Sequence, residues 1–112
     1  MTTSIDEITM DHIPIAILVV QPTHQIITAN KQSHTLFGYD AGELVGQQLE
    51  ILVPQNVRSH HTKMAEEYWN KPHSQILGSG RDLQGVRKDG TLIPVEIGLY
   101  PYNGNVMVVV VD

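Results

Sequence analysis

Two short apolar runs near the start of the chain are separated by polar residues in the way that predicts a β-hairpin. Residues 15–20 and 25–29 are rich in isoleucine, valine and alanine, and the β-branched members favour extended strands. The four residues between the runs include Pro22 and are typical of a turn. We therefore expect two antiparallel strands in the first third of the chain.

The last third of the chain has the same strand character, interrupted by two turn signals. Strands are expected over residues 76–87, 92–100 and 106–111, and the last of these is entirely apolar. The Asp-Gly pair at 89–90 is the strongest short hairpin signal in the sequence, and Asn-Gly at 103–104 predicts a second tight turn. Three consecutive strands joined in this way predict an antiparallel arrangement.

Short helices are expected between the two groups of strands. Asn30 is a favoured N-cap for a helix that runs to Phe37 and ends at Gly38. Residues 40–45 predict a further helical turn, closed by Gly46. The order of two strands, several short helices and three strands predicts an α+β fold, with a five-stranded antiparallel sheet and the helices packed on one face.

The first twelve residues have only a weak helical pattern, in which Ile5 and Ile8 are three positions apart. We expect residues 1–12 to be an N-terminal cap helix or arm. Its apolar face needs a partner, either the sheet of the same domain or a second copy of the chain. Residues 13–112 are expected to form the folded domain.

A histidine lies on the apolar side of a helix that begins near Pro54, a residue that suits the first turn of a helix. Val57, His61, Met64 and Tyr68 follow at a spacing that puts all four on one helical face. His61 is therefore expected to point into the interior. An imidazole in that position is either a ligand or a core residue bonded to a backbone group.

Composition and charge narrow the functions that these elements can support. The 112 residues suffice for one domain, and 41% are apolar and 17% charged, as in an ordinary globular chain. The net charge of −5 argues against nucleic-acid binding. Because cysteine is absent, the chain has no disulfide, thiolate nucleophile, Cys-type zinc site or cysteinyl flavin adduct.

No segment of the sequence indicates secretion, membrane insertion or catalysis. The acidic N-terminus lacks the basic start of a signal peptide, and the apolar runs at 13–20 and 106–111 are too short to span a bilayer. We therefore expect a cytoplasmic protein. No Ser-His-Asp order or acidic pair in a plausible cleft is present, and the glycines around Ser79 lack the helix start of a phosphate loop. We expect no enzyme activity.

Several short motifs resemble those of the PAS domain family of sensory modules. They are Asn30, Phe37-Gly38-Tyr39, Glu43-Leu44-Val45-Gly46, Arg87-Lys88-Asp89-Gly90-Thr91 and Pro94. The resemblance covers the chain from residue 13 to its end. It implies a PAS fold and a role as the input module of a larger signal-transduction protein, with an output domain such as a kinase, a cyclase or a transcription regulator in the same polypeptide.

Within that family, residues 53–90 resemble most the haem-binding oxygen sensors of the FixL type. The matching Pro54 and Arg58 precede His61, which falls at the position of the haem-iron ligand, and Arg81 falls at that of the distal arginine. A neutral imidazole is a good iron ligand, and a single protein ligand leaves a sixth position open for a gas. The other residues implied to surround the cofactor are Met64, Tyr68, Ile76, Leu77, Ile97 and Leu99.

Two positions depart from the FixL-type pattern. Thr62 stands where those sensors usually have aspartate, and Glu67 stands where they often have an arginine that holds a haem propionate. A carboxylate at that position would repel a propionate. Arg81 also has a structural interpretation, as a strand arginine paired with Asp82 or Glu96.

Two other functions remain open. The first is a cofactor-free module that forms a homodimer through its N-terminal helix and its sheet, with Ile5 and Ile8 in the contact, and relays a signal between neighbouring domains. The second is a PAS domain that binds a flavin or a small metabolite noncovalently in the same cavity. A zinc site at His60, His61 and His73 is not favoured, because adjacent histidines project in different directions from a helix.

Overall fold

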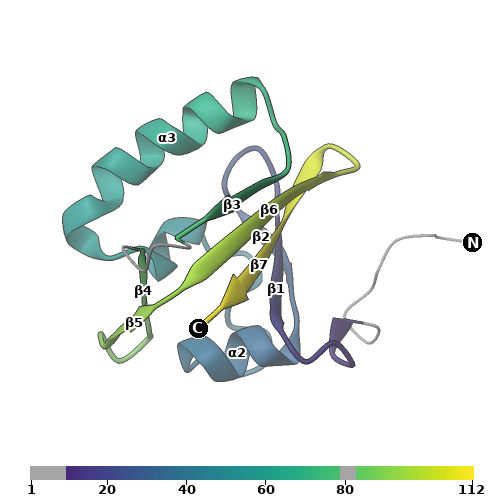
Figure 1. Cartoon of the computed structure of the whole chain (residues 1–112). Helices are drawn as coiled ribbons and strands as arrows, with labels where there is room; N and C mark the ends of the chain where they lie inside the picture. The colour runs from purple at the N-terminus through teal and green to yellow at the C-terminus, as the bar shows by residue number, and fades with distance from the viewer. Residues whose placement is uncertain (1–9, 79–82) are drawn as a thin grey trace, which may run out of the picture.

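The computed structural model describes residues 10–78 and 83–112, and Figure 1 shows the course of its elements along the chain. In order they are β1 (Ala16–Val20), β2 (Ile26–Ala29), α2 (Lys31–Phe37), η1 (Leu49–Leu52), η2 (Gln55–Val57), α3 (Arg58–Asn70), β3 (Gln75–Leu77), β4 (Gln84–Val86), β5 (Leu92–Pro94), β6 (Glu96–Tyr102) and β7 (Asn105–Val111). The elements η1 and η2 are short 3₁₀ helices.

Five of the strands form one antiparallel sheet in the order β2-β1-β7-β6-β3. The first and last strands are neighbours, with Leu18 of β1 opposite Val108 of β7. Strands β4 and β5 form a separate two-stranded hairpin around the predicted Asp-Gly turn. The predicted α+β fold with a five-stranded antiparallel sheet is therefore confirmed.

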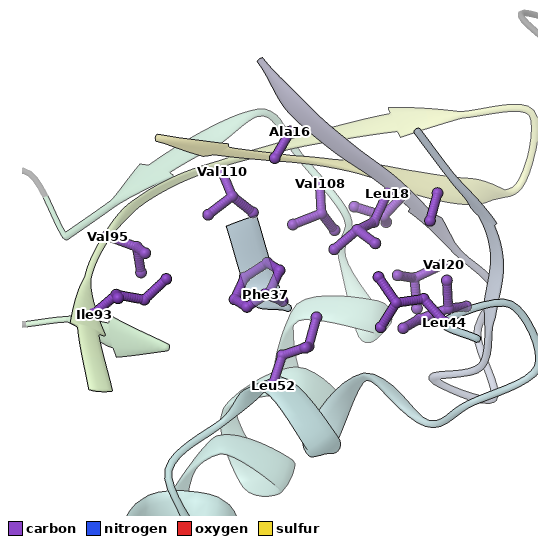
Figure 2. Close-up of a cluster of buried hydrophobic side chains, with 13 residues drawn as sticks. Ala16, Leu18, Val20, Phe37, Leu44, Leu52, Ile93, Val95, Val108 and Val110 are labelled. Atoms are coloured by element: carbon purple, nitrogen blue, oxygen red, sulfur yellow. The ribbon is translucent and has the colours of Figure 1, made fainter. Parts of the chain in front are cut away.

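One face of the sheet carries the hydrophobic core, because alternate residues of the central strands point to the same side. Val108 and Val110 of β7 face Phe37, which stands at the end of α2, and Leu52 of η1 packs from below (Figure 2). Phe37 is almost fully buried. Full burial of one such side chain stabilises the fold by about 1.5–3 kcal/mol.

Asn30 joins the first strand, the start of α2 and the segment that precedes β1. Its side chain is buried, and Oδ1 accepts hydrogen bonds from the backbone N–H groups of Ile17 at 2.8 Å and Ser33 at 3.2 Å. The side-chain amide donates to the carbonyl groups of Met10 at 3.0 Å and Ile15 at 2.8 Å. The predicted N-cap is confirmed, and it also fixes where the N-terminal segment meets the sheet.

Residues 40–45 form turns and no helix, contrary to our prediction. Gly42 and Gly46 have φ angles of 86° and 94°, in the left-handed region. A residue in that conformation cannot continue a right-handed helix. Gly42, within the predicted helical turn, therefore interrupts it, and Gly46, expected to close it, follows a segment of turns.

The long strands predicted over residues 76–87 and 92–100 are each divided in two. Strand β3 ends at Leu77, and β4 begins at Gln84. Between β5 and β6 the N–H of Val95 donates to the carbonyl of Leu83 instead of to a partner within either sheet. This hydrogen bond lies where the chain passes from β5 to β6, at the boundary between the small hairpin and the main sheet.

The predicted cap helix or arm over residues 1–12 falls almost wholly outside the described residues. Within the described part, Met10 is 1% exposed, and it lies in a small hollow beside Val19 and Met107. None of the helices in residues 10–78 and 83–112 has the length and hydropathy needed to cross a bilayer.

Candidate functional site

Helix α3 runs past the β3 side of the sheet (Figure 1). None of its 13 residues is fully buried, although its side chains face an apolar sheet surface. A cavity of about 420 Å³ lies between the helix and the sheet. This volume is within the range of pockets that hold small molecules and cofactors.

The cavity is lined mainly by apolar side chains from both layers. They come from β1, β3, β6 and β7 on one side, from α3 on the other, from η1, and from the segments that join β1 to β2 and β3 to β4. The lining residues are Val20, His24, Leu49, His61, Met64, Ala65, Tyr68, Trp69, Gln75, Leu77, Gly78, Leu83, Leu99, Val106 and Val108. Three members of the predicted apolar stripe, His61, Met64 and Tyr68, therefore face an open space instead of packing tightly into the core. The fourth, Val57, precedes α3 and is 42% exposed.

His61 stands at the wall of this cavity with a carboxylate beside it. Its Nδ1 atom lies 3.3 Å from Glu50 Oε2, and the same oxygen lies 3.4 Å from His24 Nδ1. The three residues come from α3, from η1 and from the turn between β1 and β2. Both His24 and His61 line the cavity, so the group forms one corner of it.

The pKa of the His61 imidazole is lowered, because burial disfavours its charged form. The carboxylate of Glu50 opposes part of this shift, since it stabilises a positive charge on the ring. The ordinary pKa of histidine is about 6.5. His61 is therefore neutral at pH 7, with a lone pair on one ring nitrogen for a ligand.

The residues that we predicted around a cofactor are partly brought together. His61, Met64, Tyr68, Leu77 and Leu99 line the cavity. Ile97 shares the face of β6 with Leu99 and packs against the core, outside the lining. Arg81 lies outside the described residues.

Ile76 is a correction to the prediction that places it over the site. Its side chain is 61% exposed. Because strand residues alternate between faces, Gln75 and Leu77 point into the cavity and Ile76 points to the opposite side of the sheet. The FixL-type resemblance implied both Ile76 and Leu77, but the phase of a three-residue strand could not be read from its pattern.

Three polar positions of α3 that the sequence analysis singled out lie outside the cavity lining. His60 and Glu67 are exposed, and Thr62 is exposed with its hydroxyl donating to the carbonyl of Arg58 at 3.0 Å. The carboxylate of Glu67 thus does not stand among the lining groups. In residues 10–78 and 83–112, no three His, Asp or Glu side chains are grouped so that they could hold a metal ion.

Sequence reasoning missed the roles of Glu50 and His24. His24 belongs to the turn predicted between the first two strands, and we assigned no role to it or to Glu50. These residues are distant from His61 in the chain, and no periodicity relates the three positions. Their meeting depends on how η1 and the β1–β2 turn fold against α3.

Two local features define the far wall of the cavity. The hydroxyl of Tyr68 donates to the carbonyl of His73 at 2.6 Å, which ties the end of α3 to the segment leading into β3. Gly78 has a φ angle of 83°, and a Cβ atom there would lie 2.6 Å from the carbonyl oxygen of Val95. Glycine therefore allows the chain to pass close to β6 at the edge of the cavity.

Comparisons with known proteins give matches in sequence and in fold. The PAS domain family profile matches residues 14–112. Sensor protein FixL of Bradyrhizobium diazoefficiens is 32% identical over 87 residues, which are 78% of this chain and 17% of that protein. Oxygen sensor protein DosP of Escherichia coli is 24% identical over 76 residues, 68% of this chain and 10% of that protein.

Among solved structures, the PAS domain of a protein from Colwellia psychrerythraea has a TM-score of 0.75 at 23% identity, covering 91% of this chain and 88% of that chain. At this identity the likeness concerns the fold alone. This chain spans less than a fifth of the length of either curated sensor protein.

Proposed function

This chain belongs to the PAS domain family and is a sensory input domain, and from that premise we propose that it detects oxygen or redox state through haem held by His61. The observation that carries the proposal is the corner where His61, a neutral imidazole, meets an apolar cavity of about 420 Å³. The similarity to an oxygen sensor protein, DosP, supports the same assignment.

The donor set fits a haem. The described lining includes the imidazole of His61 and largely apolar side chains that can contact a flat ring, among them Met64, Leu77 and Leu99. Haem would supply an iron centre whose sixth position binds a gas. His61 would hold the iron, and the apolar side chains would exclude water from the face of the ring. Arg81 would provide a cation near the gas-binding side, as the FixL-type resemblance implies.

The wider role in signalling follows from the relatives. FixL and DosP are sensor proteins much longer than the matched region. We infer that this domain likewise acts on an output domain in the same polypeptide, such as a kinase, a cyclase or a transcription regulator. The domain itself then has no catalytic task, and its location is cytoplasmic.

The test is uptake of haemin by the purified chain, followed by its visible spectrum. We expect a Soret band with the wild type and its loss in His61→Ala. His60→Ala is the matched control, because it removes the adjacent, exposed imidazole of the same helix and should leave the spectrum unchanged. A chain that takes up no haemin, or a Soret band that survives in His61→Ala, would contradict the proposal.

A second candidate function is a cofactor-free dimerisation and relay module, which the outer face of the sheet favours. Apolar side chains gather there, and three of them are well exposed, namely Ile76 at 61%, Tyr100 at 37% and Val111 at 41%. An exposed apolar sheet face is typical of a contact with another chain. Met107 lies opposite Tyr100 on the neighbouring strand and extends the surface.

Self-association measured by analytical ultracentrifugation tests this second function. Replacement of Tyr100 by glutamate should convert a dimer to a monomer, and Glu66→Gln on the exposed side of α3 should not. A wild-type chain that is monomeric at high concentration rules the dimer out. A yellow preparation with flavin absorption would instead indicate that the cavity holds a flavin.

A further inference from the structure

The carboxylate of Glu50 connects two histidines from separate parts of the chain. Its Oε2 atom is 3.3 Å from His61 Nδ1 and 3.4 Å from His24 Nδ1. The side chain of Glu50 is 20% exposed, and that of His24 is 16% exposed, so the contact is largely sheltered from water. A sheltered carboxylate beside two imidazoles requires an electrostatic or hydrogen-bonding reason.

Two atoms of this group have an unused hydrogen-bonding capacity. Glu50 Oε2 and His61 Nδ1 are both buried, and neither has an aligned hydrogen-bond partner. Their separation is already within hydrogen-bond length, so the alignment is what falls short.

The tautomer of His61 depends on this contact. A ring whose Nδ1 carries the proton and donates it to a carboxylate keeps the lone pair on Nε2. Histidines that bind a metal through one nitrogen generally donate the other N–H to a carboxylate or carbonyl, which fixes the ring and makes it a stronger donor to the metal. Glu50 stands at the position where such an acceptor is needed.

We propose that Glu50 is a positioning residue for His61, accepting a hydrogen bond from Nδ1 and presenting Nε2 to haem iron, while His24 shares the same carboxylate oxygen. The inference rests on the haem binding proposed above. His24 then weakens the effect of Glu50 on the His61 imidazole, because part of the negative charge of Glu50 is directed to a second imidazole.

The inference predicts shifts of opposite sign for two variants. Glu50→Gln removes the negative charge, so the iron–histidine stretching band of the reduced haem-loaded chain should move to lower frequency and the reduction potential should rise. His24→Asn leaves Glu50 to His61 alone, so both quantities should move the other way. Asparagine also tolerates the positive φ of 70° at this position.

Resonance Raman spectroscopy and potentiometry of the haem-loaded chain give both readouts. Glu66→Gln is the matched control, since it removes the same charge from an exposed position of α3 and should change neither quantity. If the substitutions only loosened the fold, the iron–histidine band would broaden in both variants. It would not shift in opposite directions in Glu50→Gln and His24→Asn.

A measurement without haem separates this inference from the proposed function. The ring-nitrogen chemical shifts of His61 in the haem-free chain should show the Nδ1-protonated tautomer in the wild type and its loss in Glu50→Ala, which removes the acceptor. If haem binds through His61 but Glu50→Gln leaves the Raman band unchanged and Glu50→Ala leaves the tautomer unchanged, the role of Glu50 is wrong and haem binding stands. If the wild type binds no haem, the proposed function and the inference both fail.

Discussion

Ile76 and Leu77 are adjacent on β3 and lie on opposite faces of the sheet. Leu77 lines the cavity beneath α3, whereas Ile76 is 61% exposed on the outer face. A substitution at either position changes the same strand, but only the change at Leu77 reaches the cavity. Substitutions at these two residues therefore distinguish effects on the cavity from effects on the outer face of the sheet.

We expect Leu77→Trp to fill part of the cavity and to weaken haem binding at least about tenfold, a loss of about 1.4 kcal/mol. Ile76→Trp should leave haem binding close to that of the wild type, because the added ring points to the other side. Haemin titration followed at the Soret band measures both. Equal losses in the two variants would show that β3 does not have the orientation described above.

Asn30→Ala should destabilise the domain by about 3 kcal/mol, since the substitution removes a helix cap and leaves buried backbone groups without partners. These groups include the N–H of Ile17 and the carbonyl of Met10. Urea unfolding gives the free energy of unfolding. Asn56→Ala, at an exposed position, should change it by less than about 0.5 kcal/mol, as surface substitutions usually do.

Gly78→Ala and Gly104→Ala separate a steric clash from backbone strain. Both glycines have φ near 80°, but a Cβ atom at Gly104 would meet nothing within 4 Å, whereas one at Gly78 would lie 2.6 Å from the backbone oxygen of Val95. We expect a loss of about 1 kcal/mol at Gly104 and about 3 kcal/mol at Gly78. Thermal unfolding of the two variants should rank them in this order, and comparable losses would contradict the close approach.

Acidification should destabilise the haem-free domain through His61. Its pKa in the folded state lies below that in the unfolded state, because burial opposes the charged form. The unfolded chain therefore binds the extra proton first as the pH falls below about 6.5. The free energy of unfolding should fall through this window and level off below the folded-state pKa.

The titration of His61 by NMR checks this sign directly. Its midpoint in the folded chain should lie below that in the urea-unfolded chain. Glu50→Gln should lower it further, because the carboxylate of Glu50 opposes the effect of burial. A folded-state midpoint at or above the unfolded value would contradict the burial of this imidazole.

Local signals in the sequence were reliable where a single residue decides the backbone conformation. Asn30 caps α2 and Gly38 ends that helix with a φ of 78°, both as predicted. The turns at 89–90 and 103–104 join the expected strands. These features depend on hydrogen bonds and steric limits within a few residues, so composition and spacing suffice to find them.

The amino-acid sequence by itself determined the family, the number of strands in the main sheet, the helix capped by Asn30, and the helical face that carries His61. Tertiary structure decided that the stripe faces a cavity, that Ile76 points away from it, and that Glu50 lies between His24 and His61. The physical reason is that these features depend on contacts between segments that are separated in the chain, and not on the pattern within one segment. A three-residue strand is too short for its pattern to fix which face is buried, and contacts between η1, α3 and the first turn arise only when the sheet brings those segments together.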